Sequence, residues 1–305
     1  MKIDLKELKQ LFSNGVNIIT YLKRKKKDDF NLINAIEIAY DLQSGSYIDY
    51  YNNNQESWKT ECSEYVKILK QHIKIGDRIL DCGTGEMTSL FGIFNKILLK
   101  NMKIYCFDIS LSRILYGRQF LNKNASSGLI KSVVPFVADI NAVPLMNKSM
   151  DVVFSTHGLE PNHGREKNIL KEIFRVARRK VILFEPCFEK SSIEGQKRME
   201  EHGYIRNLTK HIEDLGGEIE DVIKLDKASK NPLNKTYAYI IKPSLIEEDS
   251  SNEGLFTCPI NQIKLNVERT DCYYSSDSMY IYPIISSIPI LKKEAAIISF
   301  HTKML

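Results

Sequence analysis

The stretch Arg78-Ile-Leu-Asp-Cys-Gly-Thr-Gly-Glu86 decides the fold, because its pattern joins a buried strand to a helix through a glycine turn. The strand ends in Asp81, two glycines follow one residue apart, and Glu86 stands where a helix begins. Glycine allows a tight turn and a close approach of the backbone to a ligand. Asp108 ends the next predicted strand. Its spacing from the glycine loop is about that at which an acidic residue contacts a ribose in a strand–loop–helix–strand nucleoside site. We therefore expect a cofactor that contains a nucleoside.

The two carboxylates that flank the glycines indicate which cofactor this is. A dinucleotide loop would place a third glycine where Thr88 stands, and Asp81 and Glu86 would repel a pyrophosphate. A P-loop is excluded because no Gly-Lys-Ser/Thr follows. S-adenosylmethionine carries a sulfonium and an ammonium and no phosphate, so its charges suit these carboxylates. We expect S-adenosylmethionine as the cofactor.

Residues 78–188 resemble the class I S-adenosylmethionine-dependent methyltransferases, in particular the small-molecule branch that is similar to ubiquinone-biosynthesis methyltransferases. Besides the glycine loop, the segments 137–140, 141–154 and 170–186 match motifs of this family in the correct order. The alternative is a Rossmann-like fold that has lost its cofactor. The presence of all the expected ligand-facing carboxylates speaks against it.

Strand and helix signals alternate through the middle of the chain, which predicts an α/β fold. We expect a Rossmann-like, doubly wound and mainly parallel seven-stranded sheet, with an N-terminal helical cap and a small C-terminal β-rich ribbon. In the family, the last two strands form an antiparallel edge. The expected parts are a cap or lid at 1–60, the S-adenosylmethionine-binding core at 61–243, a linker at 244–254 and a degenerate zinc-ribbon-like domain at 255–305.

The resemblance implies cofactor contacts at the carboxyl ends of the strands. The glycine loop and Asp81 would hold the amino-acid part of the cofactor. Asp108 would bind the ribose hydroxyls, and Asp139 would accept from the adenine amino group. The full expected cofactor set is Asp81, Gly83, Thr84, Gly85, Glu86, Asp108, Ile109, Ser110, Asp139, Ile140, Ser155 and Thr156.

The stretch Thr156-His-Gly-Leu-Glu-Pro-Asn-His-Gly164 supplies the candidates for acceptor chemistry. Three titratable side chains, His157, Glu160 and His163, fall on a loop expected at the catalytic edge. A histidine whose pKa is near neutrality can take a proton from an attacking hydroxyl. The alternative is structural, with His157 packed under the cofactor and Glu160 capping the next helix. Glu185, at the end of the fifth predicted strand, is a further candidate.

The C-terminal part contains Cys258-Pro-Ile-Asn261 and Cys272-Tyr-Tyr-Ser275. It resembles the small zinc-ribbon family that includes activator subunits of tRNA and protein methyltransferases, but each pair keeps only its first cysteine. Structural zinc is held by four thiolate or imidazole ligands. We therefore expect a ribbon without metal, and a two-cysteine site completed by His301 is the alternative.

The N-terminal part contains two further features. Tyr47, Tyr50 and Tyr51 are expected either to form part of a lid over the acceptor or to pack the cap onto the core. The basic run 23–27 is either a solvated loop or helix end, or a contact for an anionic substrate.

Composition agrees with a soluble enzyme in the cytoplasm. The chain has 305 residues, 43% of them hydrophobic and 27% charged, and a net charge of +5. This charge is too small to indicate a nucleic-acid partner. No apolar run is long enough to span a bilayer, no signal peptide is evident, and the six cysteines are scattered as expected for reduced thiols.

The acceptor is the least determined part of the prediction. Amino-group methyltransferases often carry Asn/Asp-Pro-Pro-Tyr/Phe after the fourth strand, where this chain has Ser155-Thr-His-Gly158. We expect O-methylation, or else C-methylation, of a small molecule, with a sugar or glycan precursor as the leading class. One alternative is an RNA or protein methyltransferase with an activator-like ribbon fused in cis. Another is a cofactor-binding subunit without catalytic activity. The sequence leaves the oligomeric state open.

Overall fold

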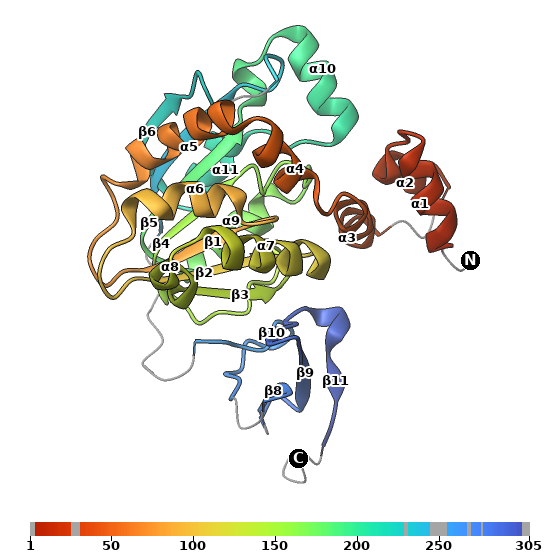
Figure 1. Ribbon diagram of the computed structural model, residues 1–305, viewed down its shortest axis with the longest axis vertical. Coiled ribbons are helices and arrows are strands. Elements are labelled where there is room, and N and C mark those ends of the chain that lie inside the picture. The colour runs from red at the N-terminus through yellow and green to blue at the C-terminus, as the bar shows by residue number, and fades with distance from the viewer. Residues whose placement is uncertain are drawn as a thin grey trace.

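A computed structural model describes residues 4–25, 31–228, 231–244, 255–266, 270–275 and 277–300 (Figure 1). Its centre is a seven-stranded sheet with the strand order β3-β2-β1-β4-β5-β7-β6. The strands are β1 (Arg78–Cys82), β2 (Lys103–Asp108), β3 (Val133–Val137), β4 (Met150–Thr156), β5 (Ala177–Pro186), β6 (Glu218–Lys224) and β7 (Thr236–Lys242). The first five strands are parallel, and β7 pairs antiparallel with β5 and β6. The predicted sheet and its antiparallel edge are confirmed.

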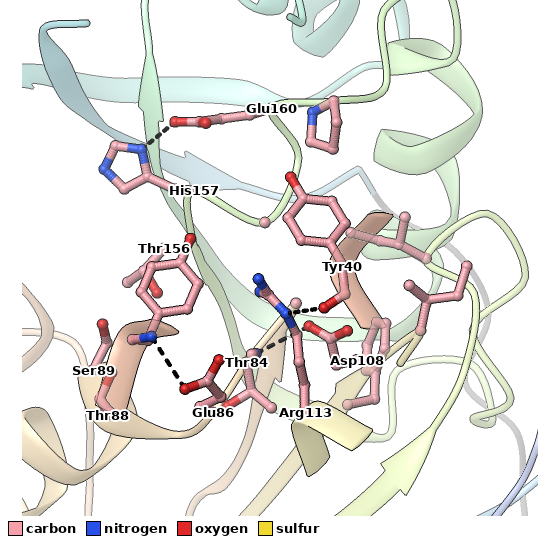
Figure 2. Close-up of a pocket in the computed structure, with 18 of the residues that line it drawn as sticks. Tyr40, Thr84, Glu86, Thr88, Ser89, Asp108, Arg113, Thr156, His157 and Glu160 are labelled. Atoms are coloured by element: carbon pink, nitrogen blue, oxygen red, sulfur yellow. Dashed lines mark hydrogen bonds and ion pairs between the residues drawn. The ribbon is translucent and has the colours of Figure 1, made fainter. Parts of the chain in front are cut away.

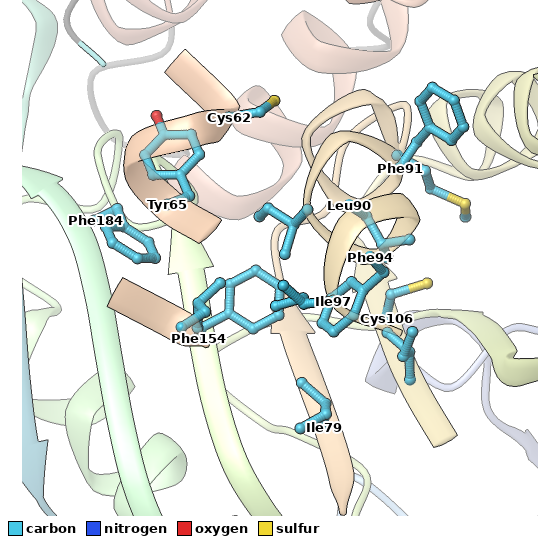
Figure 3. Packing of buried hydrophobic residues seen from close by; sticks show 14 of the residues in the cluster. Cys62, Tyr65, Ile79, Leu90, Phe91, Phe94, Ile97, Cys106, Phe154 and Phe184 are labelled. Atoms are coloured by element: carbon cyan, nitrogen blue, oxygen red, sulfur yellow. The ribbon is translucent and has the colours of Figure 1, made fainter. Parts of the chain in front are cut away.

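Helices cover both faces of this sheet. They are α5 (Gln55–Leu69), α6 (Thr88–Ile97), α7 (Leu111–Asn124), α8 (Ser127–Ser132), α9 (Glu166–Val176), α10 (Ile193–His202) and α11 (Leu208–Asp214). Neighbouring residues of β1 point to opposite faces, so Ile79 packs with α5 and α6, whereas Leu80 packs with α9 and α11. Figure 3 shows the first of these two cores, where side chains of α5 and α6 meet those of the strands. The strand order reverses between β1 and β4, which is where α/β sheets bind ligands.

Four N-terminal helices precede the sheet: α1 (Leu5–Ser13), α2 (Ile18–Lys25), α3 (Leu32–Leu42) and α4 (Ser46–Asn53). The first three share a small core of their own, and α3 and α4 lead the chain to the sheet (Figure 1). The boundary expected after residue 60 falls within α5, which packs on the main core. Of the basic run, Lys23 to Lys25 end α2, and residues 26 and 27 lie outside the described residues.

A small antiparallel sheet follows near the C-terminus. It contains β8 (Cys272–Ser275), β9 (Tyr280–Ile285), β10 (Ile288–Pro289) and β11 (Ile297–Ile298), and β9 pairs with the other three. Main-chain bonds join this part to the core, because Leu291 N donates to Val137 O at 2.8 Å and Thr257 N donates to Pro144 O at 3.0 Å. The ribbon thereby lies against the β3 side of the sheet (Figure 1). Residues 245–254 of the predicted linker, and His301, lie outside the described residues.

None of the helices in the described part of the chain combines the length and the apolar character needed to traverse a bilayer.

Candidate functional site

A cavity of about 240 Å³ opens at the carboxyl ends of the parallel strands (Figure 2). The loops after β1, β2, β3 and β4 form one part of its wall, and α3, α4 and α5 form another part. Of the fifteen predicted site residues, those that line the cavity are Gly83, Thr84, Gly85, Glu86, Asp108, Ile109, Asp139, Ile140, Thr156, His157 and Glu160. The cavity is therefore the place where the expected cofactor loops and the expected acceptor loop meet.

The glycine loop brings the backbone of two strand ends together. Gly83 and Gly85 have φ angles of 73° and 55°, in the left-handed region that favours glycine. A Cβ on Gly83 would lie 2.8 Å from the Cα of Gly158, in the loop after β4. Glycine at position 83 is thus required both by conformation and by the close approach of these two loops.

Asp108 holds the turn between β1 and α6 while its carboxylate faces the cavity. Its two oxygens accept from Gly85 N and Ser110 N, each at 3.0 Å. Burial raises the pKa of Asp108, and the guanidinium of Arg113 opposes this effect. A carboxylate fixed by backbone donors at the end of β2 is well placed to accept hydrogen bonds from two adjacent hydroxyls.

Asp81 lies below the cavity rather than in its lining. Thr84 Oγ1 donates to its Oδ2 at 2.7 Å, and its Oδ1 is buried and has no hydrogen-bond partner among the described residues. Burial raises the pKa of Asp81 to about 7. Ionisation of Asp81 would be favoured by a further donor or a positive charge at Oδ1.

Glu86 lines the cavity, but its carboxylate binds the N-terminal region. It accepts from Gly45 N at 3.0 Å, Tyr47 N at 3.1 Å and Ile48 N at 2.9 Å. These are the free donors at the start of α4, whose N-cap residue Gly45 has no side chain to satisfy them. Glu86 therefore caps α4 from the glycine loop and fixes this helix beside the cavity.

Two serines of the predicted cofactor set lie outside the cavity lining. Ser110 is buried, accepts from Arg113 N as the N-cap of α7, and donates its hydroxyl to Asp41 at 2.7 Å. Ser155 is buried and donates to Glu185 Oε1 at 2.8 Å. Both hydroxyls hold elements of the site together.

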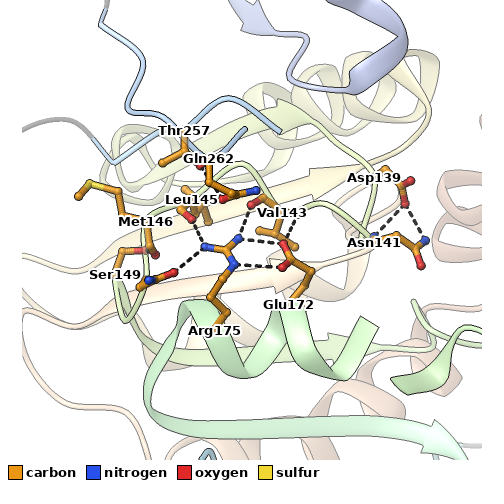
Figure 4. Close-up of polar contacts among 11 residues, drawn as sticks. Asp139, Asn141, Val143, Leu145, Met146, Ser149, Glu172, Arg175, Thr257 and Gln262 are labelled. Atoms are coloured by element: carbon orange, nitrogen blue, oxygen red, sulfur yellow. Dashed lines mark hydrogen bonds and ion pairs between the residues drawn. The ribbon is translucent and has the colours of Figure 1, made fainter. Parts of the chain in front are cut away.

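The loop after β3 carries the expected adenine contacts, Asp139 and Ile140. Asp139 Oδ1 accepts from the backbone and side-chain nitrogens of Asn141 at 2.9 and 2.8 Å (Figure 4). Arg175 of α9 donates to the carbonyls of Leu145 and Val143 at 2.6 and 2.7 Å. The arginine fixes the loop from behind, which limits the movement of its cavity-facing residues.

The loop after β4 brings two of the three predicted catalytic residues together. His157 Nδ1 contacts Glu160 Oε1, and His157 Nε2 lies 3.1 Å from Thr236 Oγ1. Asn234 Nδ2 also donates to Glu160 Oε1, at 3.2 Å. His163 lies outside the cavity lining, with its side chain 46% exposed and its Nδ1 3.0 Å from Glu166 Oε1.

Glu185 is fully buried behind this loop and outside the cavity lining. Its Oε1 accepts from Ser155 Oγ and from Leu159 N at 3.1 Å. Burial raises the pKa of Glu185 to about 8. It fixes the shape of the loop that carries His157 and Glu160.

Several lining residues were missed by sequence reasoning. Arg113 is 3% exposed, donates to Tyr40 O and Gln43 Oε1 at 3.1 Å each, and lies against the rings of Tyr40 and Tyr47. The lining residues without a sequence prediction include Tyr40, Trp58, Glu61, Tyr65, Arg113, Asn141 and Asn231. A signal was present on α5, because residues 58, 61 and 65 recur at helical spacing and share one face.

Comparison with known proteins agrees with this geometry. The sequence profile of the family described as "Methyltransferase domain" matches residues 73–238, more than half of the chain. A search of curated proteins gives no match. The structure resembles magnesium protoporphyrin IX methyltransferase from Synechocystis PCC 6803, which was solved with bound S-adenosylhomocysteine. The TM-score is 0.50 and the sequence identity 14%, and the aligned part covers 68% of this chain and 99% of that chain.

A second solved structure is similar to the same extent. It is a complex between the methyltransferase activator of Haloferax volcanii and a methyltransferase. The TM-score is 0.51 and the sequence identity 12%, and the aligned part covers 67% of this chain and 97% of that chain. Likenesses at this identity show the fold, and the family is shown by the sequence profile. The protein belongs to the methyltransferase-domain family and is an S-adenosylmethionine-dependent methyltransferase.

Proposed function

We propose that the protein transfers the methyl group to a hydroxyl of a small molecule, with a sugar or glycan precursor as the leading acceptor class. The observation that carries this proposal is that His157 and Glu160 line the same cavity as Asp108. A proton acceptor and the expected ribose ligand then face one enclosed space. This arrangement supports a small acceptor that enters the cavity.

The cofactor would lie across the carboxyl ends of β1, β2 and β3. Its ribose hydroxyls would donate to Asp108, its adenine would pack between Ile109 and Ile140, and its ammonium would compensate the buried Oδ1 of Asp81. This last contact is supported by the absence of a hydrogen-bond partner for that atom among the described residues. The cofactor supplies an activated methyl group, so the protein mainly has to position the acceptor.

The transfer requires one proton acceptor. The acceptor oxygen forms a bond to the methyl carbon as the carbon–sulfur bond breaks, which leaves a neutral thioether. The hydroxyl proton passes to the Glu160 carboxylate, which His157 Nδ1 and Asn234 Nδ2 hold in place. We assign no role in this step to His163, which lies outside the cavity lining.

Label transfer from tritiated S-adenosylmethionine tests the proposal. Cell extracts are separated into small molecules, glycans, RNA and protein, and each fraction is incubated with the enzyme. We expect label in the small-molecule or glycan fraction, with the rate reduced at least tenfold in Glu160→Gln and less in His163→Asn. Label confined to RNA or protein, or a larger loss in His163→Asn, would refute the proposal.

One observation favours a second candidate, a macromolecular methyltransferase with its activator-like ribbon in cis. The ribbon pairs through its main chain with the β3 side of the core, between Val137 and Ile290. RNA or protein labelling in the same assay is the outcome that this candidate predicts. A cofactor-binding subunit without activity predicts no label in any fraction.

We also propose that the ribbon holds no zinc. Cys258 Sγ lies 3.2 Å from the hydroxyl of Tyr282, and the Asn261 amide donates to Ser278 O at 3.4 Å. The described residues contain no group of three or more metal-ligating side chains. Elemental analysis of the purified protein tests this, and one zinc per chain that survives dialysis against a chelator would contradict it.

A further inference from the structure

We propose that the acceptor carries a protonated amino group beside its hydroxyls, as an amino sugar or another amino alcohol does. The group would be recognised by Tyr50, Trp58, Glu61 and Tyr65, which we call the acceptor wall. All four line the cavity, and all four precede the segment 73–238 that matches the methyltransferase family. The inference rests on the proposed function, because it describes the acceptor of that reaction.

The acceptor wall is a rigid surface. Trp58, Glu61 and Tyr65 are 9%, 8% and 3% exposed and share one face of α5. Tyr50 of α4 donates its hydroxyl to Glu61 Oε1 at 2.7 Å. The Trp58 ring stacks on Phe91 with their centroids 5.9 Å apart, so its position is fixed from behind.

The described lining of the cavity is rich in carboxylates. Among its described lining residues, the carboxylates are Glu61, Glu86, Asp108, Asp139 and Glu160, whereas Arg113 is the only lysine or arginine. Arg113 lies beside the glycine loop, because a Cβ on Gly85 would be 3.4 Å from its Nη1. On the acceptor side, the carboxylates among the described lining residues are Glu61 and Glu160, with His157 beside the latter.

The tyrosines of this side respond to that charge. Burial raises the pKa of Tyr50 and of Tyr65, and the nearby Glu61 carboxylate raises both further. A negative potential of this kind repels a phosphate or a carboxylate on the acceptor and attracts a cation.

The aromatic rings add a second attraction for the same group. An ammonium is stabilised by tryptophan and tyrosine rings, most strongly when water is excluded. A buried carboxylate is stabilised by a charged donor close to it. Aromatic rings and a carboxylate on one wall therefore favour an ammonium over a neutral group of the same size.

Binding of three probes of equal size tests this inference without knowledge of the natural acceptor. Benzylamine, benzyl alcohol and benzoate are titrated by calorimetry into the protein saturated with S-adenosylhomocysteine. We expect a Kd for benzylamine at least tenfold below that for benzyl alcohol, and no binding of benzoate. Equal affinities, or tighter binding of benzoate, would overturn the inference.

Variants of α5 assign the preference to the acceptor wall. Glu61→Gln should raise the Kd of benzylamine at least tenfold, Glu61→Asp should recover part of the loss, and S-adenosylhomocysteine affinity should stay within twofold. Glu56→Gln, on the exposed first turn of the same helix, should leave all values unchanged. An unchanged benzylamine Kd in Glu61→Gln would reject the role of this residue.

The labelled product separates this inference from the proposed function. If small molecules are labelled, the labelled product should bind a cation exchanger at pH 6. A neutral or anionic product would overturn this inference and leave the proposed function standing. If calorimetry shows the preference for the amine but no fraction is labelled, the proposed function would fail and the preference of the cavity for an ammonium would stand.

Discussion

The two halves of the cavity are built in different ways. The cofactor half, where we propose that the cofactor binds, consists of turns that follow β1, β2 and β3. Its main contacts join residues close in sequence or on adjacent strands, such as Asp108 with Ser110 and Gly85. The acceptor half consists of side chains from α4, α5, the loop after β4 and the loop before β7. Its contacts join distant residues, such as Glu160 with Asn234.

This difference shows where the chain is constrained and where it can vary. The cofactor half depends on backbone geometry, so few residue types are compatible with it. The acceptor half depends on side chains from helices and loops, among which Trp58 and Tyr65 also pack in the main core. Substitutions in the first half should therefore affect cofactor binding and folding, whereas substitution of polar side chains in the second, such as Glu61 and Glu160, should mainly affect the acceptor.

The largest effect is expected for Asp108→Ala. Loss of two charge-assisted hydrogen bonds to the ribose corresponds to about 3–5 kcal/mol, more than 100-fold in affinity for S-adenosylmethionine. Calorimetric titration measures it, with Asp214→Ala on the surface of α11 as the control. A loss below tenfold would contradict the placement of the ribose.

Gly83→Ala should destabilise the fold by about 2–4 kcal/mol, because the new Cβ meets Gly158 and the φ angle is unfavourable for alanine. Urea unfolding measures the change. Gly128→Ala is the matched control, since its nearest neighbour would be 3.9 Å away and its φ is not positive. Equal stability of the two variants would show that the two loops do not constrain each other.

The pH dependence should show the buried Asp81. Its pKa is raised to about 7, so its contribution to stability is present at low pH and is lost as pH rises through about 7. The slope is at most about 1.4 kcal/mol per pH unit, and Asp81→Asn should remove it. S-adenosylmethionine favours the ionised form, so its affinity should rise between pH 6 and 8 with release of a proton. An affinity independent of pH would argue against contact between Asp81 and the cofactor ammonium.

The smallest effect is expected for Glu86→Gln, at the boundary of the two halves. The amide offers one acceptor oxygen and no charge to the start of α4, so the helix end should lose about 1 kcal/mol. Hydrogen exchange at Gly45, Tyr47 and Ile48 should become roughly fivefold faster by this estimate. Unchanged exchange would mean that α4 is held by other contacts.

Most of the residues that line the cofactor half of the cavity could be predicted from the sequence. Glycine spacing and strand-end carboxylates are local patterns, and they placed Gly83, Gly85 and Asp108 at one cavity. Prediction went less far where burial decides the role of a side chain. Ser110 and Ser155 fit the motif but lie outside the cavity lining, because their hydroxyls bond to Asp41 and Glu185.

The acceptor half could be predicted only in part. The loop after β4 was identified, but the separation of His163 from His157 depends on the turn of that loop and on the pairing of His163 with Glu166. The role of α5 could not be predicted, because which face of a helix meets a cavity depends on how α4 and α5 pack against the sheet. The helical spacing of Trp58 and Glu61 is equally compatible with a buried core.

A crystal structure with S-adenosylhomocysteine tests the central claim most directly. The account predicts that the ribose hydroxyls contact Asp108, that the ammonium approaches Asp81, and that the sulfur faces the space between Glu61 and Glu160. A nucleoside bound elsewhere, or a sulfur that points away from those two carboxylates, would contradict it.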